Sequence, residues 1–286
     1  MAKESDRIGQ VLGGRYKIIA SLDKGGQGSI YVGLDQKAGD KVAIKVLSER
    51  MARSSEWRER MFREAQAMTQ LAGTAAVRVY HQVWTDDGAL ALIMELLIGS
   101  ELETWLYERE TAGKKLSVPE LVKLFDPIVE TLEKAHDVGI LHRDLKPANI
   151  FVLKDGSVRL LDFGLAKFTR MRGLTQAGFV AGSPSYIAPE GWLGEPQLLD
   201  QRIDVYALGA VIYRALAAEA LFPAGDAKES WRLATTAERP SLYAKRPDLG
   251  PGIDDWVREA LAIDPNRRFL RVRGLWNAFK STVRTA

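Results

Sequence analysis

His142–Gly164 reads HRDLKPANIFVLKDGSVRLLDFG, and the middle of this stretch predicts a β-hairpin. Two apolar runs, Ile150–Leu153 and Val158–Leu161, flank the dipeptide Asp155-Gly156. An Asp-Gly pair between strand-like runs is a strong signal for a two-residue type I′ turn, which needs positive φ at both central residues. We therefore expect two antiparallel strands joined at this dipeptide.

The ends of the predicted hairpin carry polar side chains. In the register of a two-residue turn, Asn149 lies directly opposite Asp162, with Cβ atoms roughly 5 Å apart. An amide oxygen and a carboxylate at that separation suit a hard cation such as Mg²⁺. An ordinary hairpin with polar ends would carry the same residues, so the hairpin alone leaves both interpretations open.

Three short motifs occur in order along the chain. They are His142–Asn149 (HRDLKPAN), Asp162–Gly164 (DFG) and Ala188–Glu190 (APE). Together they resemble the signature set of the eukaryotic-like (Hanks-type) serine/threonine protein kinases, as bacteria also possess them. The resemblance runs from Arg15 to Phe279, nearly the whole chain.

The resemblance implies an α+β, bilobal kinase fold. Residues 1–97 would form a small ATP-binding lobe with an antiparallel sheet and one main helix. Residues 98–286 would form a larger, mainly helical lobe that is catalytic and binds substrate. The two lobes together would make one catalytic domain.

Composition fits this interpretation and disfavours others. The chain has 286 residues, 46% hydrophobic and 27% charged, with a net charge of +3. It has no cysteine and no apolar stretch near the roughly 20 residues that span a bilayer, so we expect a cytoplasmic location and no membrane segment. Arginines crowd near the C-terminus (Arg267, Arg268, Arg271 and Arg273), but such clusters are usually solvated or paired, and we expect no nucleic-acid binding. Whether the chain is a whole protein or the domain of a larger membrane protein stays open.

Two strand-like runs near the N-terminus, Tyr16–Ser21 and Ser29–Leu34, are joined by a glycine-rich segment. Glycine lets backbone N–H groups approach phosphate oxygens closely, although a plain hairpin would look the same. In the family's pattern, Gly25 and Gly28 match the second and third glycines. Asp23 stands in place of the first, where a carboxylate would weaken nucleotide binding.

The next strand-like run is Val42–Leu47. Side chains alternate between faces of a strand, so Ala43 and Lys45 share one face. In the family this lysine holds the α- and β-phosphates and pairs with a glutamate. Glu64, on a predicted helix at Ser55–Leu71, is the matching residue.

The resemblance also implies the nucleotide contacts. Met94 would stand at the gatekeeper position, and the backbone of Glu95 and Leu97 would hydrogen-bond adenine. The side chains that would sandwich the adenine ring are Leu22, Ile30, Ala43 and Phe151.

The catalytic roles follow from the same motifs. Asp144 would accept the proton of a substrate hydroxyl, and Lys146 would stabilise the transferring phosphoryl group. Asn149 and Asp162 would hold Mg²⁺, with ATP as the phosphoryl donor. Lys146 in DLKPAN also assigns the chain to the serine/threonine branch.

Other family positions are structural. His142 and Phe163 should pack together, and Glu190 should pair with Arg268. Leu121–Asp137 has a helical apolar stripe interrupted by Pro127, which predicts a kink or a helix start capped by Asp126.

A second predicted helix, Asp204–Ala217, is apolar nearly all round and should be buried. Asp204 would cap it and also brace the catalytic loop.

Two other classes of function remain as alternatives. A pseudokinase or scaffold module is favoured slightly by Asp23 and by an irregular stretch at Ala72–Val77. A small-molecule phosphotransferase with a similar core is disfavoured by the segment ending in Ala188–Glu190. The main interpretation implies protein substrates with serine or threonine, and self-association for autophosphorylation.

Thr175 is a candidate phosphorylation site. Arg143 and Lys167 would face the activation segment in related kinases and would repel each other without an anion. A phosphothreonine brings about −1.5 to −2 charges and can pair with both.

Overall fold

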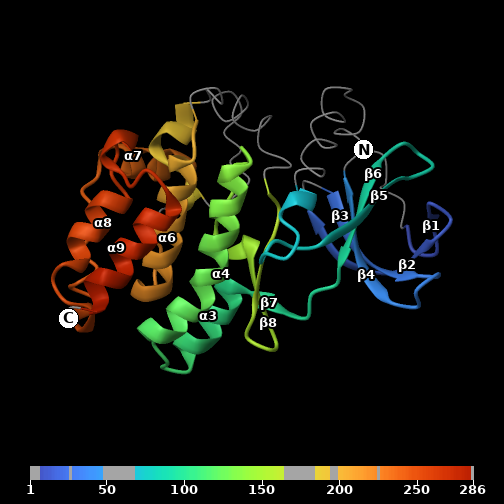
Figure 1. The fold of residues 1–286 in the computed structure, drawn as a ribbon, viewed down its shortest axis with the longest axis horizontal. Coiled ribbons are helices and arrows are strands. Elements are labelled where there is room, and N and C mark those ends of the chain that lie inside the picture. The colour runs from blue at the N-terminus through green and yellow to red at the C-terminus, as the bar shows by residue number, and fades with distance from the viewer. Residues whose placement is uncertain are drawn as a thin grey trace. The chain divides into compact units, whose positions relative to one another are not determined.

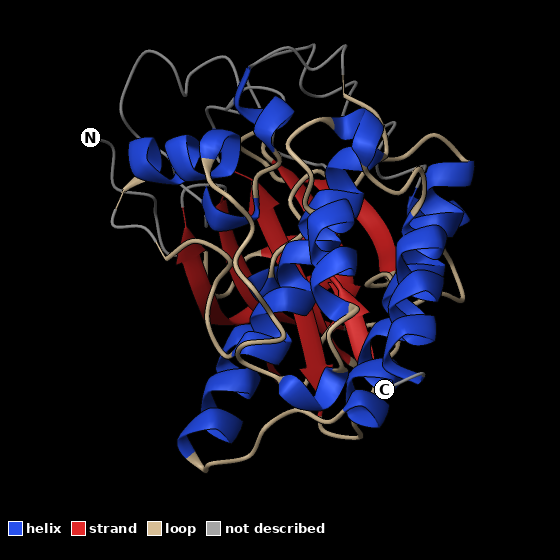
Figure 2. Ribbon diagram, turned by 90° about the vertical axis from the view of Figure 1, so that its left-hand side faces the viewer, coloured by secondary structure: helices blue, strands red, loops and turns tan. Residues whose placement is uncertain are grey.

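The computed structural model describes residues 7–25, 28–47, 68–163, 184–193, 199–223 and 226–284. The chain divides into two compact units, one of Met1–Ala72 with Val77–Ile98 and the other of Gly73–Ala76 with Gly99–Ala286. A β-sheet dominates the first unit and helices dominate the second (Figure 1), and Figure 2 separates the two kinds of element by colour. The architecture is therefore α+β, as predicted.

The sheet of the first unit is antiparallel, with the strand order β1-β2-β3-β4-β6-β5. Its strands are β1 (Val11–Leu12), β2 (Tyr16–Gly25), β3 (Gly28–Asp35), β4 (Lys41–Leu47), β5 (Val79–Trp84) and β6 (Leu90–Glu95). The two predicted N-terminal strands are confirmed as the neighbours β2 and β3, which extend to the paired residues Gly25 and Gly28.

The faces of this sheet differ as strand alternation predicts. On β4, the side chains of Val42, Ile44 and Val46 are buried in the core cluster of the unit. Successive side chains point to opposite faces, so Ala43 and Lys45 lie on the other face. The shared face predicted for these two residues is therefore confirmed.

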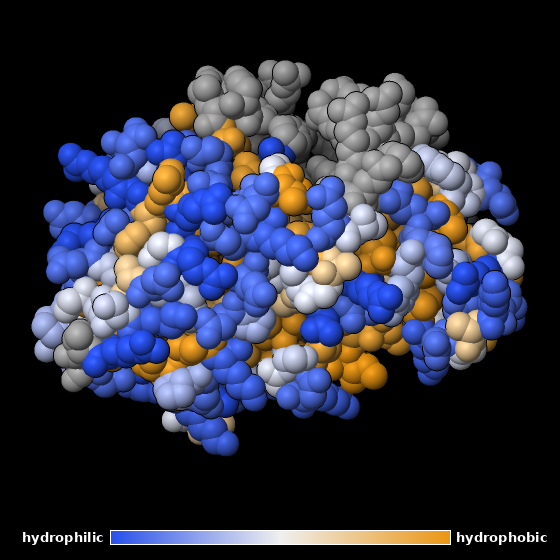
Figure 3. All heavy atoms as spheres, in the orientation of Figure 1, coloured by the Kyte–Doolittle hydropathy of each residue, from blue (hydrophilic) through white to orange (hydrophobic). Residues whose placement is uncertain are grey.

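The second unit combines a small antiparallel sheet, ordered β7-β8-β9, with several helices. Its strands are β7 (Gly99–Glu101), β8 (Ile150–Leu153) and β9 (Val158–Leu160). Its helices are α3 (Leu102–Thr111), α4 (Val118–Asp137), α6 (Arg202–Ala217), α7 (Ala227–Thr236), α8 (Ile253–Ala260) and α9 (Val272–Arg284). The face of this unit drawn in Figure 3 is covered mainly by hydrophilic side chains. No helix among the described residues is both long and apolar enough to cross a membrane.

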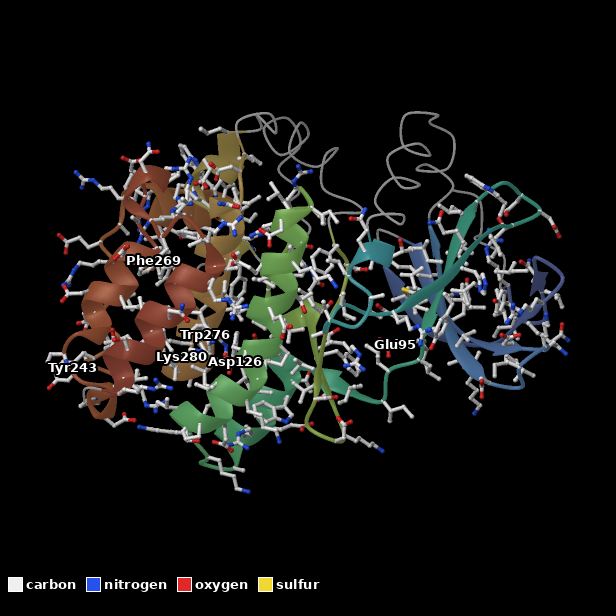
Figure 4. The ribbon with its side chains drawn as sticks, in the orientation of Figure 1. Glu95, Asp126, Tyr243, Phe269, Trp276 and Lys280 are labelled. Atoms are coloured by element: carbon white, nitrogen blue, oxygen red, sulfur yellow. The ribbon has the colours of Figure 1, made fainter. Side chains whose placement is uncertain are left out.

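Helix α4 starts earlier than predicted and runs through Pro127. Ser117 caps it and forms a capping box with Glu120, so the expected cap at Asp126 is wrong. The Asp126 carboxylate instead accepts hydrogen bonds from Trp276 Nε1 at 2.5 Å and Lys280 Nζ at 3.1 Å (Figure 4). It therefore anchors α9 to α4.

Helix α6 is buried nearly all round, as predicted, but it begins at Arg202. Asp204 lies inside its first turn rather than at the N-cap, so that expectation is wrong. Its carboxylate instead accepts hydrogen bonds from the backbone N–H groups of His142 and Arg143. The helix predicted at Ser55–Leu71 lies outside the described residues except for its last residues, Met68–Leu71.

Candidate active site

The loop that carries Asp144 is braced by the buried carboxylate of Asp204. This carboxylate accepts hydrogen bonds from the backbone N–H groups of His142 and Arg143 and pairs with His136 Nε2, each at 2.8 Å. Burial alone would raise the pKa of Asp204, but the hydrogen bonds and the neighbouring histidines hold it below its ordinary value. The brace confirms the second role expected for Asp204.

Arg143 needs such a brace because its φ is 61°, in the left-handed region that non-glycine residues avoid. His136 was missed by the sequence interpretation. It lies on α4, six positions before His142, and no motif in the chain marks it.

His142 connects the loop to Leu161, the residue that follows the second strand of the hairpin. Its Nε2 donates to the Leu161 carbonyl oxygen at 2.9 Å, and its Nδ1 accepts the Asp144 N–H at 3.3 Å. Its ring packs against Phe163 with centroids 4.8 Å apart, which confirms the expected contact. Burial lowers the pKa of His142, so the imidazole is neutral in this arrangement.

Asp144 and Lys146 form the charged centre of the loop. Lys146 Nζ lies 3.4 Å from Asp144 Oδ2, and both side chains are partly exposed, at 17% and 15%. A carboxylate and an ammonium held together at an accessible position can accept a proton and neutralise negative charge side by side.

Asn149 ends the short 3-10 turn Pro147–Asn149 and is tied to Asp144. Its Nδ2 donates to the Asp144 carbonyl oxygen at 2.7 Å. Because the amide nitrogen is committed to this bond, the orientation of the amide oxygen is fixed as well. Side-chain and backbone bonds thus hold Asp144, Lys146 and Asn149 in one small cluster.

The hairpin register differs from the prediction by one residue. Ile150 pairs with Leu160 and Val152 with Val158, so Asn149 lies opposite Leu161, whose N–H it accepts at 2.8 Å. The predicted direct pairing of Asn149 with Asp162 is wrong.

The turn explains the shift. Leu153 N–H bonds to the Ser157 carbonyl, so the loop has three residues, and only Gly156 of the Asp155-Gly156 pair has positive φ. The Asp155 carboxylate accepts the N–H of Ser157 at 2.8 Å and its hydroxyl at 2.7 Å. This side-chain turn replaces the type I′ geometry, which needs positive φ at both positions.

Asp162 still lies at the same end of the hairpin as Asn149. It follows Leu161 directly, and its φ of 53° turns the chain at that point. A carboxylate and an oriented amide oxygen form a donor set that suits Mg²⁺. The residues present therefore fit this cation.

The first unit brings together several residues that the sequence predicts to bind the nucleotide. Cross-strand pairs place Ile30 opposite Lys45 and Ala43 opposite Met94. Directly opposite residues share a face, so these four side chains form one surface. Lys45 is only 5% exposed. A largely buried lysine implies an anionic partner.

Residues of the glycine-rich segment lie next to this surface in register. Asp23 pairs with Ile30, in the same cross-strand row as Lys45, and its Oδ1 accepts the Lys24 N–H at 2.8 Å. Leu22 falls at a register shift in β2 and is 53% exposed. An exposed leucine beside this surface is available to an apolar ligand.

Glu95 ends β6 (Figure 4). Its N–H donates to the Arg78 carbonyl at 2.9 Å, and its Oε1 accepts the Arg78 N–H at 2.8 Å. Both bonds tie Glu95 to the backbone of Arg78. Leu97 follows outside the strand and is half-buried.

In the second unit, Phe151 is half-buried on β8, opposite Arg159. Glu64 and Thr175, which the sequence interpretation singled out, lie outside the described residues.

Glu190 and Arg268 pair as predicted. The guanidinium binds the carboxylate through two bonds of 2.6 and 2.7 Å, and its side chain is fully buried. It also donates to backbone carbonyls of Ala262, Ile263 and Arg202. This pair ties the Pro189–Leu193 turn to the segment before α9.

Comparison with known proteins defines the class. The model of the protein kinase domain matches residues 16–273, so the chain belongs to the protein kinase family. A crystal structure of the PknI kinase domain of Mycobacterium tuberculosis superposes with a TM-score of 0.76 at 27% identity, covering 97% of this chain and all of that one.

Curated relatives identify the branch. The serine/threonine-protein kinase PknA of Mycobacterium tuberculosis is 34% identical over 269 residues, covering 93% of this chain and 60% of the relative. A probable serine/threonine-protein kinase of Streptomyces coelicolor is 33% identical over 264 residues, covering 90% of this chain and 38% of the relative. The chain is a bacterial-type serine/threonine kinase domain, and it spans less than two thirds of the length of these relatives.

Proposed function

We propose that this chain transfers the γ-phosphoryl group of ATP, with Mg²⁺, to serine and threonine hydroxyls of proteins. The observation that carries the proposal is the cluster of Asp144, Lys146 and Asn149 on a loop braced by Asp204. Phosphoryl transfer needs positioning and charge neutralisation more than covalent participation, and this cluster offers both.

The second unit supplies the groups nearest the reaction. Asp144 holds the substrate hydroxyl and takes its proton, while Lys146 neutralises charge on the transferring group. Asn149 and Asp162 hold Mg²⁺ through their oxygens. When bound, the cation neutralises charge on the phosphates and orients them.

The first unit supplies groups that bind the nucleotide. Lys45 binds the α- and β-phosphates, and Glu64 orients Lys45. The backbone at Gly25 and Gly28 approaches the phosphates, because glycine leaves that approach unobstructed. The remaining contacts are to adenine, from the backbone of Glu95 and Leu97 and the side chains of Leu22, Ile30, Ala43 and Phe151.

One observation bears on the substrate class and another on nucleic-acid binding. The buried pair of Glu190 with Arg268 stabilises the turn after the activation segment, which is a support for docking peptides and favours protein substrates over small molecules. Two of the C-terminal arginines also have acidic partners: Arg268 pairs with Glu190, and Arg271 binds Glu133 at 2.7 Å and Asp137 at 2.8 Å. This pairing supports the absence of a nucleic-acid role, and we place the domain in the cytoplasm.

The test is transfer of labelled phosphate from ATP to a generic protein such as casein, followed by phosphoamino-acid analysis. We expect Mg²⁺-dependent label on serine and threonine, and its loss in Lys45→Met. Nucleotide binding without any transfer by the wild-type protein would support the pseudokinase alternative instead. Transfer only to small molecules would support the other alternative.

We also propose autophosphorylation at Thr175 through self-association. Its support is the sequence position alone, between Gly173 and Gly178 and after the cations Arg143 and Lys167. Intact-mass and peptide spectra after incubation with Mg·ATP test it. Absence of phosphate on Thr175, together with full activity of Thr175→Ala, would contradict this part and leave the kinase assignment standing.

A further inference from the structure

The strand that leads to Asp162 is held by a segment far away in the sequence. Ala76 forms a parallel bridge with Leu160, and the Leu160 N–H donates to the Ala75 carbonyl at 2.7 Å. Ala75 and Ala76 are both buried. The stretch that looked irregular in the sequence therefore pairs with the last residue of β9.

Thr131 on α4 holds this segment from the other side. Its hydroxyl oxygen accepts the Ala75 N–H at 2.9 Å and donates its own hydrogen to the Pro127 carbonyl at 2.7 Å. Thr131 is fully buried, so water does not compete for either hydrogen bond. The backbone of Ala75 is thus bound at its N–H by Thr131 of α4, and its carbonyl in turn binds β9.

The residue after Leu160 is fixed as well. The Leu161 N–H donates to the Asn149 carbonyl at 2.8 Å, and its carbonyl accepts His142 Nε2 at 2.9 Å. Asp162 then follows with φ 53°. The backbone that presents its carboxylate is consequently set by contacts to Ala75, Asn149 and His142, and the first depends on Thr131.

We propose that Thr131 is a positioning residue for Asp162. Its hydroxyl holds the backbone of Ala75, the Ala75 carbonyl holds β9, and β9 sets where the Asp162 carboxylate meets Mg²⁺. The inference rests on the proposed function, because it takes Asp162 as the metal ligand. A merely structural threonine would stabilise the fold without changing the dependence on the cation.

The decisive variant is Thr131→Val, which has nearly the same shape but no hydroxyl. A buried N–H left without its acceptor is energetically costly, so the backbone at Ala75 should shift toward another acceptor. We expect faster hydrogen–deuterium exchange of the Ala75 and Leu160 amides in the ligand-free protein. We also expect Mg²⁺ to bind the ADP complex about three- to thirtyfold more weakly by calorimetry, the range that substitutions along a coupled network of contacts produce.

Two further variants separate positioning from stability. Thr131→Ser keeps the hydroxyl and should restore both measurements. Ser230→Ala is the matched control, because Ser230 also has a buried hydroxyl that donates to the carbonyl four residues earlier, that of Asp226 at the N-cap of α7. It should lower the melting temperature without altering exchange at Leu160 or Mg²⁺ binding.

Unchanged exchange and unchanged Mg²⁺ binding in Thr131→Val would overturn the inference. So would an equal loss of Mg²⁺ binding in Ser230→Ala. If Thr131→Val does not fold, Thr131→Cys can replace it, because a thiol forms weaker hydrogen bonds than a hydroxyl. This variant should show smaller changes of the same kind. Wild-type exchange and wild-type Mg²⁺ binding in Thr131→Cys would contradict the inference. Wild-type protein that binds ADP and Mg²⁺ but transfers no phosphate would contradict the proposed function while leaving this test intact.

Discussion

The side-chain amide of Asn149 donates to the backbone carbonyl oxygen of Asp144 across 2.7 Å. This bond joins the residue proposed to hold Mg²⁺ to the residue proposed to take the substrate proton. It also explains why an amide rather than a carboxylate stands at position 149. Only the amide offers a donor to Asp144 and an oxygen to the cation from one side chain.

The first prediction tests that choice. Asn149→Asp provides a charged oxygen ligand, which by itself favours Mg²⁺, but it places a carboxylate oxygen against the Asp144 carbonyl. We expect at least about a tenfold fall in kcat, equivalent to about 1.4 kcal/mol, with the melting temperature little changed. Steady-state kinetics at saturating Mg²⁺ measure it. Activity equal to wild type would show that the bond to Asp144 has no part in catalysis.

The second prediction concerns the buried pair of Arg268 with Glu190. Arg268→Met leaves the Glu190 carboxylate and several carbonyls without their donor, and breaking a buried pair typically costs about 3–5 kcal/mol. Arg258→Met is the matched control, because Arg258 pairs with Asp255 on the surface with both side chains largely exposed. Exposed pairs contribute about 1 kcal/mol or less.

Denaturant unfolding of both variants measures the difference in the free energy of unfolding. We expect a much larger loss in Arg268→Met than in Arg258→Met. Equal losses would mean that the Glu190 pair does not support the fold.

The third prediction is a pH dependence of stability from His142. Its folded pKa is lowered by burial, so as pH falls the unfolded chain binds a proton first. The free energy of unfolding should therefore fall as pH drops below about 6.5, the pKa of an exposed histidine, by up to about 1.4 kcal/mol per pH unit. His142→Gln keeps a donor and an acceptor but does not titrate, so its slope between about pH 5 and 7 should be smaller. A slope identical to wild type would exclude His142 as the source.

The hairpin shows where sequence reasoning succeeds and where it stops. Apolar runs around Asp155-Gly156 were sufficient to predict two paired strands. The register was not predictable, because it depends on whether Asp155 adopts positive φ or binds Ser157 through its side chain, and both suit the same dipeptide. A shift of one residue was enough to replace Asp162 with Leu161 opposite Asn149.

Helix α4 illustrates a second limit. Its apolar stripe was visible in the sequence, but Pro127 and Asp126 resembled a helix start. Tertiary contacts decide otherwise, since Asp126 binds Trp276 and Lys280 on a helix about 150 positions later in the chain. The contact of Thr131 with Ala75 is of the same kind: it joins distant segments through a backbone N–H, and backbone groups leave no mark in the sequence.

The resemblance to the kinase family, in contrast, was sufficient to predict several contacts between residues at the family's fixed positions. Glu190 with Arg268, His142 with Phe163, and Asp204 with the catalytic loop were all expected from the resemblance, and all are present. The sequence predicts these contacts because each of them joins two fixed positions of the family's pattern.

The measurement that most directly tests the proposed chemistry is the turnover of Asp144→Asn. Asparagine preserves the shape but removes the carboxylate that would take the substrate proton beside Lys146. Removing one well-placed electrostatic group typically lowers the rate about 10²–10³-fold, so we expect a loss of that size with nucleotide binding and melting temperature retained. More than about a tenth of wild-type turnover, a loss under about 1.4 kcal/mol, would contradict the role assigned to Asp144.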